Sequence, residues 1–459
     1  MPDQTIIAAL REQVLPLRNE DDLDAVLDHI GDASLVLLGE ASHGTRDFYR
    51  LRASLSKRLI VERGFDAIAV EADWPDALQV SRFVQLCDTG PGADQTADQA
   101  LSGFGRFPQW MWRNEEMVDL VYWMRLHNQQ VADAERRIGF YGLDLYSLQK
   151  SMHAVVRYLD HADPEAAQRA RARYSCIDHM AMDPQRYGYA TAFGLKAHCE
   201  EEMVRQLAEL TAQAHQHMSR QGGSVPDALF YAQQNARVAQ NAESYYRAMF
   251  SSRDESWNIR DRHMADTLDA LHAHLAAKRG GKAKIAVWAH NSHLGDARAT
   301  EMGQQGQLNL GQLVRERYQS DEVYLLGFST HTGTVTAASE WDGPAELKRV
   351  LPSRPDSVER LLHDIGKAHE HDVLERYLLP IRRCEPVRRA LPERLLERAI
   401  GVIYRPESER LSHYFNANLA RQFDGVIHVD RSGALRPLEV SPQWAPRESE
   451  AAETFPSGL

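Results

Sequence analysis

Cysteine is scarce in this sequence, and no dense cysteine pattern is present. Only four cysteines occur among 459 residues, and they lie far apart: Cys87, Cys176, Cys199 and Cys384. No CxxC pair occurs, so the sequence indicates neither a zinc knuckle nor a disulfide framework. We therefore expect a protein of a reducing compartment, the cytoplasm.

Long apolar runs and an excess of positive charge are also absent. No stretch is apolar enough to span a bilayer, and the first twenty residues carry charges among their apolar side chains, which is not typical of a signal peptide. The formal net charge is −12. A negative surface argues against nucleic acids and anionic membranes as partners.

Short apolar runs alternate with segments of helical periodicity. We expect strands at residues 34–40, 66–72, 137–144, 284–293, 322–330, 399–406 and 425–430, a helix over 46–63, and another helix opened by Pro75. Strands that alternate with helices favour a parallel sheet. The expected fold class is α/β, with a mostly parallel central sheet flanked by helices.

The segment from Ser147 to about Leu275 has helical periodicity almost throughout. The sequence thus predicts four parts: an α/β core over 1–146, a helical cap or insertion over 147–276, the rest of the core over 277–440, and a flexible tail over 441–459.

Polar residues follow the expected strands where each strand ends. The first run is followed by Glu40, Ser42 and His43, the second ends in Glu71, the third in Asp144, and the fourth in His290, Asn291 and His293. In open α/β sheets, ligands bind beyond the carboxyl ends of the strands, so these side chains are expected to share one crevice.

Each of these residues also has a structural reading when it is taken alone. His43 could begin a helix, Glu71 could pair with an arginine, and Asp144 could form a turn. The two later histidines could pack beside Trp288. Together, however, acids and imidazoles at one sheet edge suit general-base chemistry, because the acid fixes the tautomer of the base.

Three of the motifs resemble one known family. GEASHGT with Arg52 downstream, then VEADW, then WAHNSHLGD, are similar in kind and order to motifs of the erythromycin esterase family. The resemblance implies an α/β core with a helical lobe. It also implies hydrolysis of a macrolide lactone ester, a step linked to antibiotic resistance, with no metal and no cofactor.

The resemblance also implies roles for individual residues. The implied catalytic set is Glu40, His43, Arg52, Glu71, His290 and His293. Asp144, Trp74 and Asn291 are expected to bind the substrate. Arg260 and Asp261, in NIRDRHMADTL, look like a family segment, and we expect them to cap or to form salt bridges.

Four functions remain open for this cluster. His43 could activate water, with Glu40 or Glu71 orienting it and His290, His293 or Arg52 stabilising the oxyanion. Ser42 could be a nucleophile, although EASHG is not the GxSxG motif. The histidines and acids could hold zinc or manganese, although HExxH is absent. The crevice could also only bind a small ligand.

The expected partner is a small-molecule ester or lactone, and the helical region is expected to form one wall of its cleft. Aromatic side chains in this region could line that wall or pack in the core of the cap: Tyr187, Tyr189, Phe193, Phe230 and Tyr231. The sequence does not specify the substrate or the oligomeric state.

Overall fold

The computed structural model describes residues 4–87, 93–178, 184–192, 198–221, 226–250, 252–369 and 371–444. Within these residues, nine strands form one sheet with eight in the path β1-β8-β11-β6-β2-β5-β3-β4, and β7 pairs with β6. The strands in this order are β1 (Leu15–Pro16), β8 (Arg376–Pro380), β11 (Gly425–Ser432), β6 (Val323–Ala337), β2 (Leu35–Leu38), β5 (Ile285–Trp288), β3 (Ala67–Asp73), β4 (Gly139–Asp144) and β7 (Glu346–Val350). A separate pair joins β9 (Leu395–Arg398) to β10 (Tyr414–Ala417).

Six consecutive strands, from β11 to the edge strand β4, run parallel, which confirms an α/β fold with a mostly parallel sheet. Strand β2 lies in the middle, where Leu35 pairs with Ile285 on one side and with Val323 on the other. All four of its residues are buried. A strand covered on both faces needs an unbroken apolar run, which is why LVLL shows no alternation.

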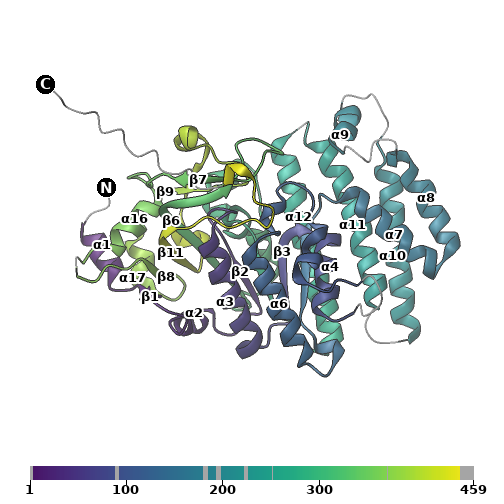
Figure 1. The fold of residues 1–459 in the computed structure, drawn as a ribbon, viewed down its shortest axis with the longest axis horizontal. Coiled ribbons are helices and arrows are strands. Elements are labelled where there is room, and N and C mark those ends of the chain that lie inside the picture. The colour runs from purple at the N-terminus through teal and green to yellow at the C-terminus, as the bar shows by residue number, and fades with distance from the viewer. Residues whose placement is uncertain are drawn as a thin grey trace.

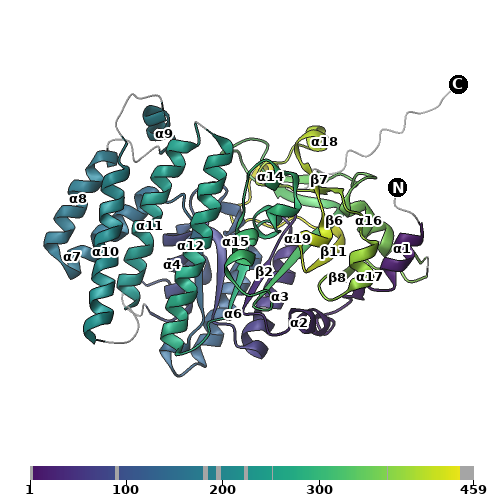
Figure 2. The same cartoon turned by 180° about the vertical axis from the view of Figure 1, so that it is seen from behind.

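Helices cover both faces of the sheet (Figures 1 and 2). The longer ones are α1 (Gln4–Arg11), α2 (Leu23–Ile30), α3 (Arg46–Arg63), α4 (Trp74–Val84), α6 (Glu115–Gln129), α7 (Leu148–Ala162), α8 (Pro164–Asp178), α9 (Pro184–Ala192), α10 (Glu200–Gln221), α11 (Asp227–Ala248), α12 (Arg253–Arg279), α15 (Leu310–Arg317) and α16 (Val358–Gly366). The shorter ones are α5 (Ala97–Ala100), α13 (Asn291–Leu294), α14 (Glu301–Gln304), α17 (Glu385–Ala390), α18 (Glu409–Ser412) and α19 (Leu419–Gln422).

Successive residues of β2 point into different cores. Val36 and Leu38 belong to the core that includes Phe48 and Leu55 of α3, together with side chains of α2, α4 and α6. Leu35 and Leu37 belong to the core that includes Leu268 of α12 and side chains of α1, α15 and α16. This alternation follows from the two-residue repeat of a strand.

Between β4 and β5 the described residues form helices joined by short connections, and none of them forms a strand. Helices α7, α8, α10 and α11 share a third core, which is separate from the two sheet cores. In Figures 1 and 2 these helices stand at the end of the molecule opposite the two termini, and α12 lies between them and the sheet. Because α12 packs into a sheet core, the helical lobe and the sheet are tied together along one long helix.

Three expectations need correction or comment. Residues 399–406 do not form a strand: Ile400 and Ile403 make isolated bridges to Ser42 and Ala338, and the strand of this region is β9. The sequence indicated no disulfide framework, and the structure adds one isolated pair, Cys176 and Cys199, which are bonded. Most of the predicted tail, residues 445–459, lies outside the described residues. Among the described helices, none is long and apolar enough to cross a membrane.

Candidate active site

Glu40 and His43 form a buried pair directly after β2. Nδ1 of His43 lies 2.9 Å from Oε1 of Glu40, and the two residues are 7% and 1% exposed. Gly39 leaves room for the side chain of Asn291, because a Cβ there would lie 2.2 Å from Oδ1 of Asn291. Within the described residues, Nε2 of His43 has no hydrogen-bond partner, so this nitrogen is available to a ligand.

Arg52 holds the other oxygen of the Glu40 carboxylate. Its Nη2 donates to Oε2 of Glu40 at 2.7 Å, and the residue is 0% exposed. The guanidinium carbon lies 4.6 Å from the ring centre of Tyr49 and 4.7 Å from that of Trp288. Arg52 is therefore sealed inside the protein, where it neutralises Glu40 and cannot reach a substrate.

Arg260 joins two of the strand-end carboxylates. Its Nε and Nη2 donate to Asp144 at 3.0 and 2.7 Å, and Nη2 also donates to Oε1 of Glu71 at 2.7 Å. The second oxygen of Glu71 accepts the backbone N–H of His290 at 2.9 Å. Burial favours the neutral acid, but the charges of His293 and Arg260 outweigh it and hold the pKa of Glu71 well below its usual range.

His293 lies in a second charged group next to Glu71. Its Nδ1–H donates to Asp261, with both carboxylate oxygens at 2.9 Å, and its ring stacks on Trp257 with 4.5 Å between centres. Its Nε2 lies 3.1 Å from Nη1 of Arg260 and 3.4 Å from Oε1 of Glu71. Burial lowers the pKa of His293, but the Asp261 and Glu71 carboxylates reverse this and raise it to about 9.

His290 faces His43 and stays neutral. The two ring centres lie 4.8 Å apart. Burial, followed by the proximity of His43, lowers the pKa of His290 to about 3. Its Nδ1 accepts the backbone N–H of Ser292 at 3.2 Å, so the proton of the neutral ring resides on Nε2. That Nε2 is buried and has no partner among the described residues.

Trp74 and Asn291, two of the predicted substrate-binding residues, contact other parts of the protein. Trp74 is 1% exposed, and its ring packs against Tyr141 and Phe230 in a sheet core, so it offers no surface to a substrate. Asn291 uses its side chain to bind backbone atoms of Phe328 on β6, which fixes the start of α13, where His290 is the N-cap and His293 lies in the helix. The third, Asp144, is engaged by Arg260 as described above.

Ser42 has no base beside it. Its hydroxyl pairs with Oγ1 of Thr45 at 2.5 Å, and the residue is 1% exposed. A nucleophilic serine needs a histidine within hydrogen-bond reach, and the described contacts of Ser42 include none.

The aromatic residues expected at the cleft wall are mostly internal. Tyr187 is fully buried and donates to Glu243, and Phe230 stacks on His274 with 3.9 Å between ring centres. Tyr231 is partly buried against the same core, and Tyr189 is 50% exposed. Phe193 lies outside the described residues.

The charged network around Arg260 includes more residues than the sequence indicated. The salt bridges expected of Arg260 are present, and they reach two predicted site residues, Glu71 and Asp144; Arg260 also lies against a third, His293. The sequence also did not indicate that Arg106 pairs with Asp73, the last residue of β3, or that Arg106 and Arg260 both lie over the ring of Tyr146. The motif VEAD contains Asp73, which was the available signal.

The carboxylates of the site are paired with its cationic side chains and histidines. Each of the carboxylates Glu40, Glu71, Asp144 and Asp261 accepts from an arginine or a histidine. Among the described residues, no group of three or more His, Cys, Asp or Glu side chains is arranged to hold a metal ion. The site thus places one histidine that can act as a base, His43, beside one that can donate a hydrogen bond, His290, and the surrounding carboxylates are paired with cationic side chains.

A family model and a curated relative name the same family. A family model described as Erythromycin esterase matches residues 60–432. A protein of Escherichia coli named Erythromycin esterase type II is 22% identical over 432 residues, which cover 91% of this chain and 94% of that protein.

Solved structures with the same fold include one titled a succinoglycan biosynthesis protein, with a TM-score of 0.72 and 20% identity over 94% of this chain and 98% of that one. A mutant of the erythromycin esterase EreC in its open conformation has a TM-score of 0.65 and 16% identity, over 92% of this chain and 96% of that one.

Proposed function

This chain belongs to the erythromycin esterase family, and from that premise we propose that it hydrolyses an ester or lactone with a water molecule activated by His43. The family supports a hydrolase of this type. The macrolide macrolactone is the first substrate to consider, because the Escherichia coli relative is named for such a compound. Inactivation of a macrolide antibiotic would follow from that activity.

The observation that carries the proposal is the pairing of His43. Glu40 holds Nδ1 at 2.9 Å, and no described residue engages Nε2. A histidine held in this way presents Nε2 as the base, with its tautomer and orientation fixed by the acid. Glu40, rather than Glu71, is the orienting acid, because Glu71 binds Arg260 and the backbone of His290.

His290 is the best-placed group to stabilise the oxyanion. Its Nε2–H is buried, lacks a partner among the described residues and belongs to the ring that faces His43. Arg52 is sealed behind Glu40, and the two ring nitrogens of His293 face the carboxylates of Asp261 and Glu71, so neither residue supplies a free donor. A preorganised donor aimed at developing negative charge is the usual device for acyl transfer.

The reaction then proceeds in two steps. The water oxygen bonds to the ester carbonyl carbon while Nε2 of His43 takes its proton, which gives a tetrahedral oxyanion next to His290. When the intermediate collapses, the bond from carbon to the alcohol oxygen breaks, and the proton on His43 passes to the leaving alkoxide. The products are a carboxylic acid and an alcohol, and the enzyme is returned unchanged.

Arg260 positions these groups without touching the substrate. It neutralises Glu71 and Asp144, and Glu71 in turn holds the backbone of His290. We propose that no metal takes part, which the family resemblance supports.

A substrate panel tests this function. Macrolactones, small lactones and aryl esters should be incubated with the protein, and ring-opened or cleaved products should be detected by mass spectrometry as the gain of one water. The matched control is His43→Asn, which keeps a polar side chain of similar size. Turnover of at least one ester that disappears in the control supports the proposal. Equal turnover by both proteins, or none on any ester, contradicts it.

A further inference from the structure

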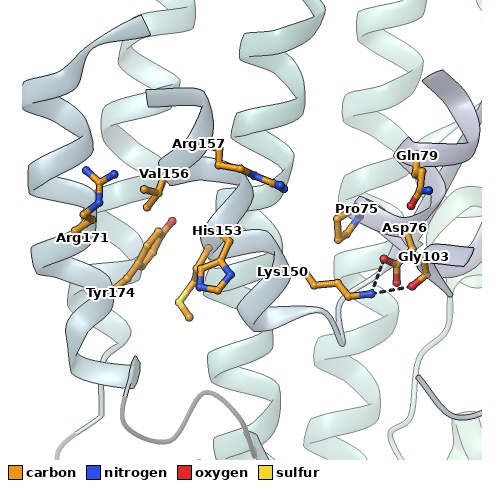
Figure 3. Close-up of a pocket in the computed structure, with 11 residues that line it drawn as sticks. Pro75, Asp76, Gln79, Gly103, Lys150, His153, Val156, Arg157, Arg171 and Tyr174 are labelled. Atoms are coloured by element: carbon orange, nitrogen blue, oxygen red, sulfur yellow. Dashed lines mark hydrogen bonds and ion pairs between the residues drawn. The ribbon is translucent and has the colours of Figure 1, made fainter. Parts of the chain in front are cut away.

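A cavity lies between α4 and the first two helices of the lobe, α7 and α8 (Figure 3). Its volume is about 800 Å³, within the range of sites that bind small molecules. The residues that line it are Pro75, Asp76, Gln79, Gly103, Lys150, Met152, His153, Val156, Arg157, Arg171 and Tyr174. None of them belongs to the proposed catalytic set.

The cavity carries a surplus of positive charge. Lys150 binds Asp76, the only carboxylate in the lining, with Nζ 2.8 Å from Oδ1, and Arg171 binds Asp160 outside the lining. Arg157 remains. Within the part of the chain that the structure describes, its guanidinium forms no ion pair and no hydrogen bond. An unpaired guanidinium at the wall of a cavity favours an anionic guest.

A buried hydroxyl in the lining also lacks a partner. Tyr174 is 3% exposed, and its hydroxyl makes no hydrogen bond to any described residue. Figure 3 shows this hydroxyl directed toward α7, near Val156 and His153. Because a buried polar group without a partner is unfavourable, a small rotation of the Tyr174 side chain that brings the hydroxyl to the cavity surface would let it bind a polar atom of a ligand.

Part of the wall is apolar, formed by Pro75, Met152 and Val156, and Gln79 and His153 add polar groups to the lining. We propose that this cavity binds an amphipathic anion, a small molecule with a carboxylate or phosphate group on an apolar body. Arg157 pairs with the anionic group, Tyr174 donates a hydrogen bond to a ligand oxygen, and the apolar side chains contact the body. This site goes beyond the proposed ester hydrolysis and does not depend on it.

Calorimetric titration of the full chain with three matched probes tests the proposal: octanoate, octyl phosphate and 1-octanol, each below its micelle concentration. The first two should bind and the neutral alcohol should not. A preference for octyl phosphate or for octanoate identifies the anionic group, and either one supports the proposal. Equal binding of 1-octanol, or no binding of either anion, overturns it.

Three variants sharpen the test. Arg157→Gln should weaken binding of the anions roughly tenfold or more, since it removes a charged hydrogen-bond donor. Tyr174→Phe should weaken binding roughly threefold to tenfold, yet keep the thermal stability of the free protein, because the lost hydroxyl has no partner there. Arg410→Gln, an exposed arginine on α18, is the matched control and should change nothing. An unchanged affinity in Arg157→Gln refutes the assignment.

Discussion

The buried pair of Glu40 and Arg52 should show strong coupling when the two residues are replaced singly and together. Arg52 is 0% exposed, and Glu40 is its only ion-pair partner among the described residues. Glu40→Gln therefore leaves a buried guanidinium without a countercharge. Removal of one partner of such a pair costs about 3–5 kcal/mol of the free energy of unfolding.

Arg52→Met also destabilises the protein, because Glu40 then keeps only His43 as a partner and the rings of Tyr49 and Trp288 lose the guanidinium. The double variant removes both charges. A buried pair that is replaced by neutral groups of similar size is often close to neutral in stability. The double variant should thus cost several kcal/mol less than the sum of the two single losses.

Urea unfolding of the four proteins at one pH measures these differences. Hydrolysis should be measured on the same samples, and it should stay low in the double variant although stability recovers, because His43 no longer faces a carboxylate. Additive losses of stability would refute the idea that Arg52 is held only to neutralise Glu40. Full activity in Glu40→Gln would refute the role given to the acid.

Three further results are expected. Folding raises the pKa of His293 from 6.5 to about 9, so the protonated ring stabilises the folded protein fully below pH 6.5, and this stabilisation is lost as the pH rises through 9. The free energy of unfolding should therefore fall by about 3 kcal/mol over that window. His293→Asn should flatten the slope of the unfolding free energy against pH. Dialysis against a strong chelator should leave activity unchanged, and a rate restored only by added zinc or manganese would contradict metal-free chemistry. Ser42→Ala should keep most of the activity and lose about 1 kcal/mol of stability with its hydrogen bond to Thr45, whereas a thousandfold loss of rate would identify a serine nucleophile.

The sequence predicted the sheet where apolar runs are short, unbroken and followed by polar residues. The helix expected over 46–63 matches α3, Arg46–Arg63, because Gly64 ends it in a left-handed conformation that most side chains disfavour. Strand β8 was missed: RYLLP is a short antiparallel strand, and its pairing with β11 comes from tertiary structure. Residues 399–406 were predicted as a strand from their apolar content, yet they form only isolated single-residue bridges, one of them from Ile400 to Ser42 beside the site.

The sequence predicted those site residues that follow directly from the ends of the parallel strands. Glu40, His43, Glu71, Asp144, His290 and His293 come together because parallel strands present their carboxyl ends at one edge. The contacts of Arg260 with Glu71 and Asp144 span 189 and 116 residues of sequence, and they depend on how α12 crosses the sheet. Trp74 was misjudged because a tryptophan next to a site residue can turn either toward the ligand or into the core.

The central claim is that His43 is the base, and its most direct test is the steady-state rate of His43→Asn on the best ester of the panel. The variant should unfold at nearly the wild-type urea concentration, and its kcat should be roughly 10²–10⁴-fold lower, the usual contribution of a general base. A variant that folds normally and keeps a kcat within a few-fold of the wild-type value would contradict the account.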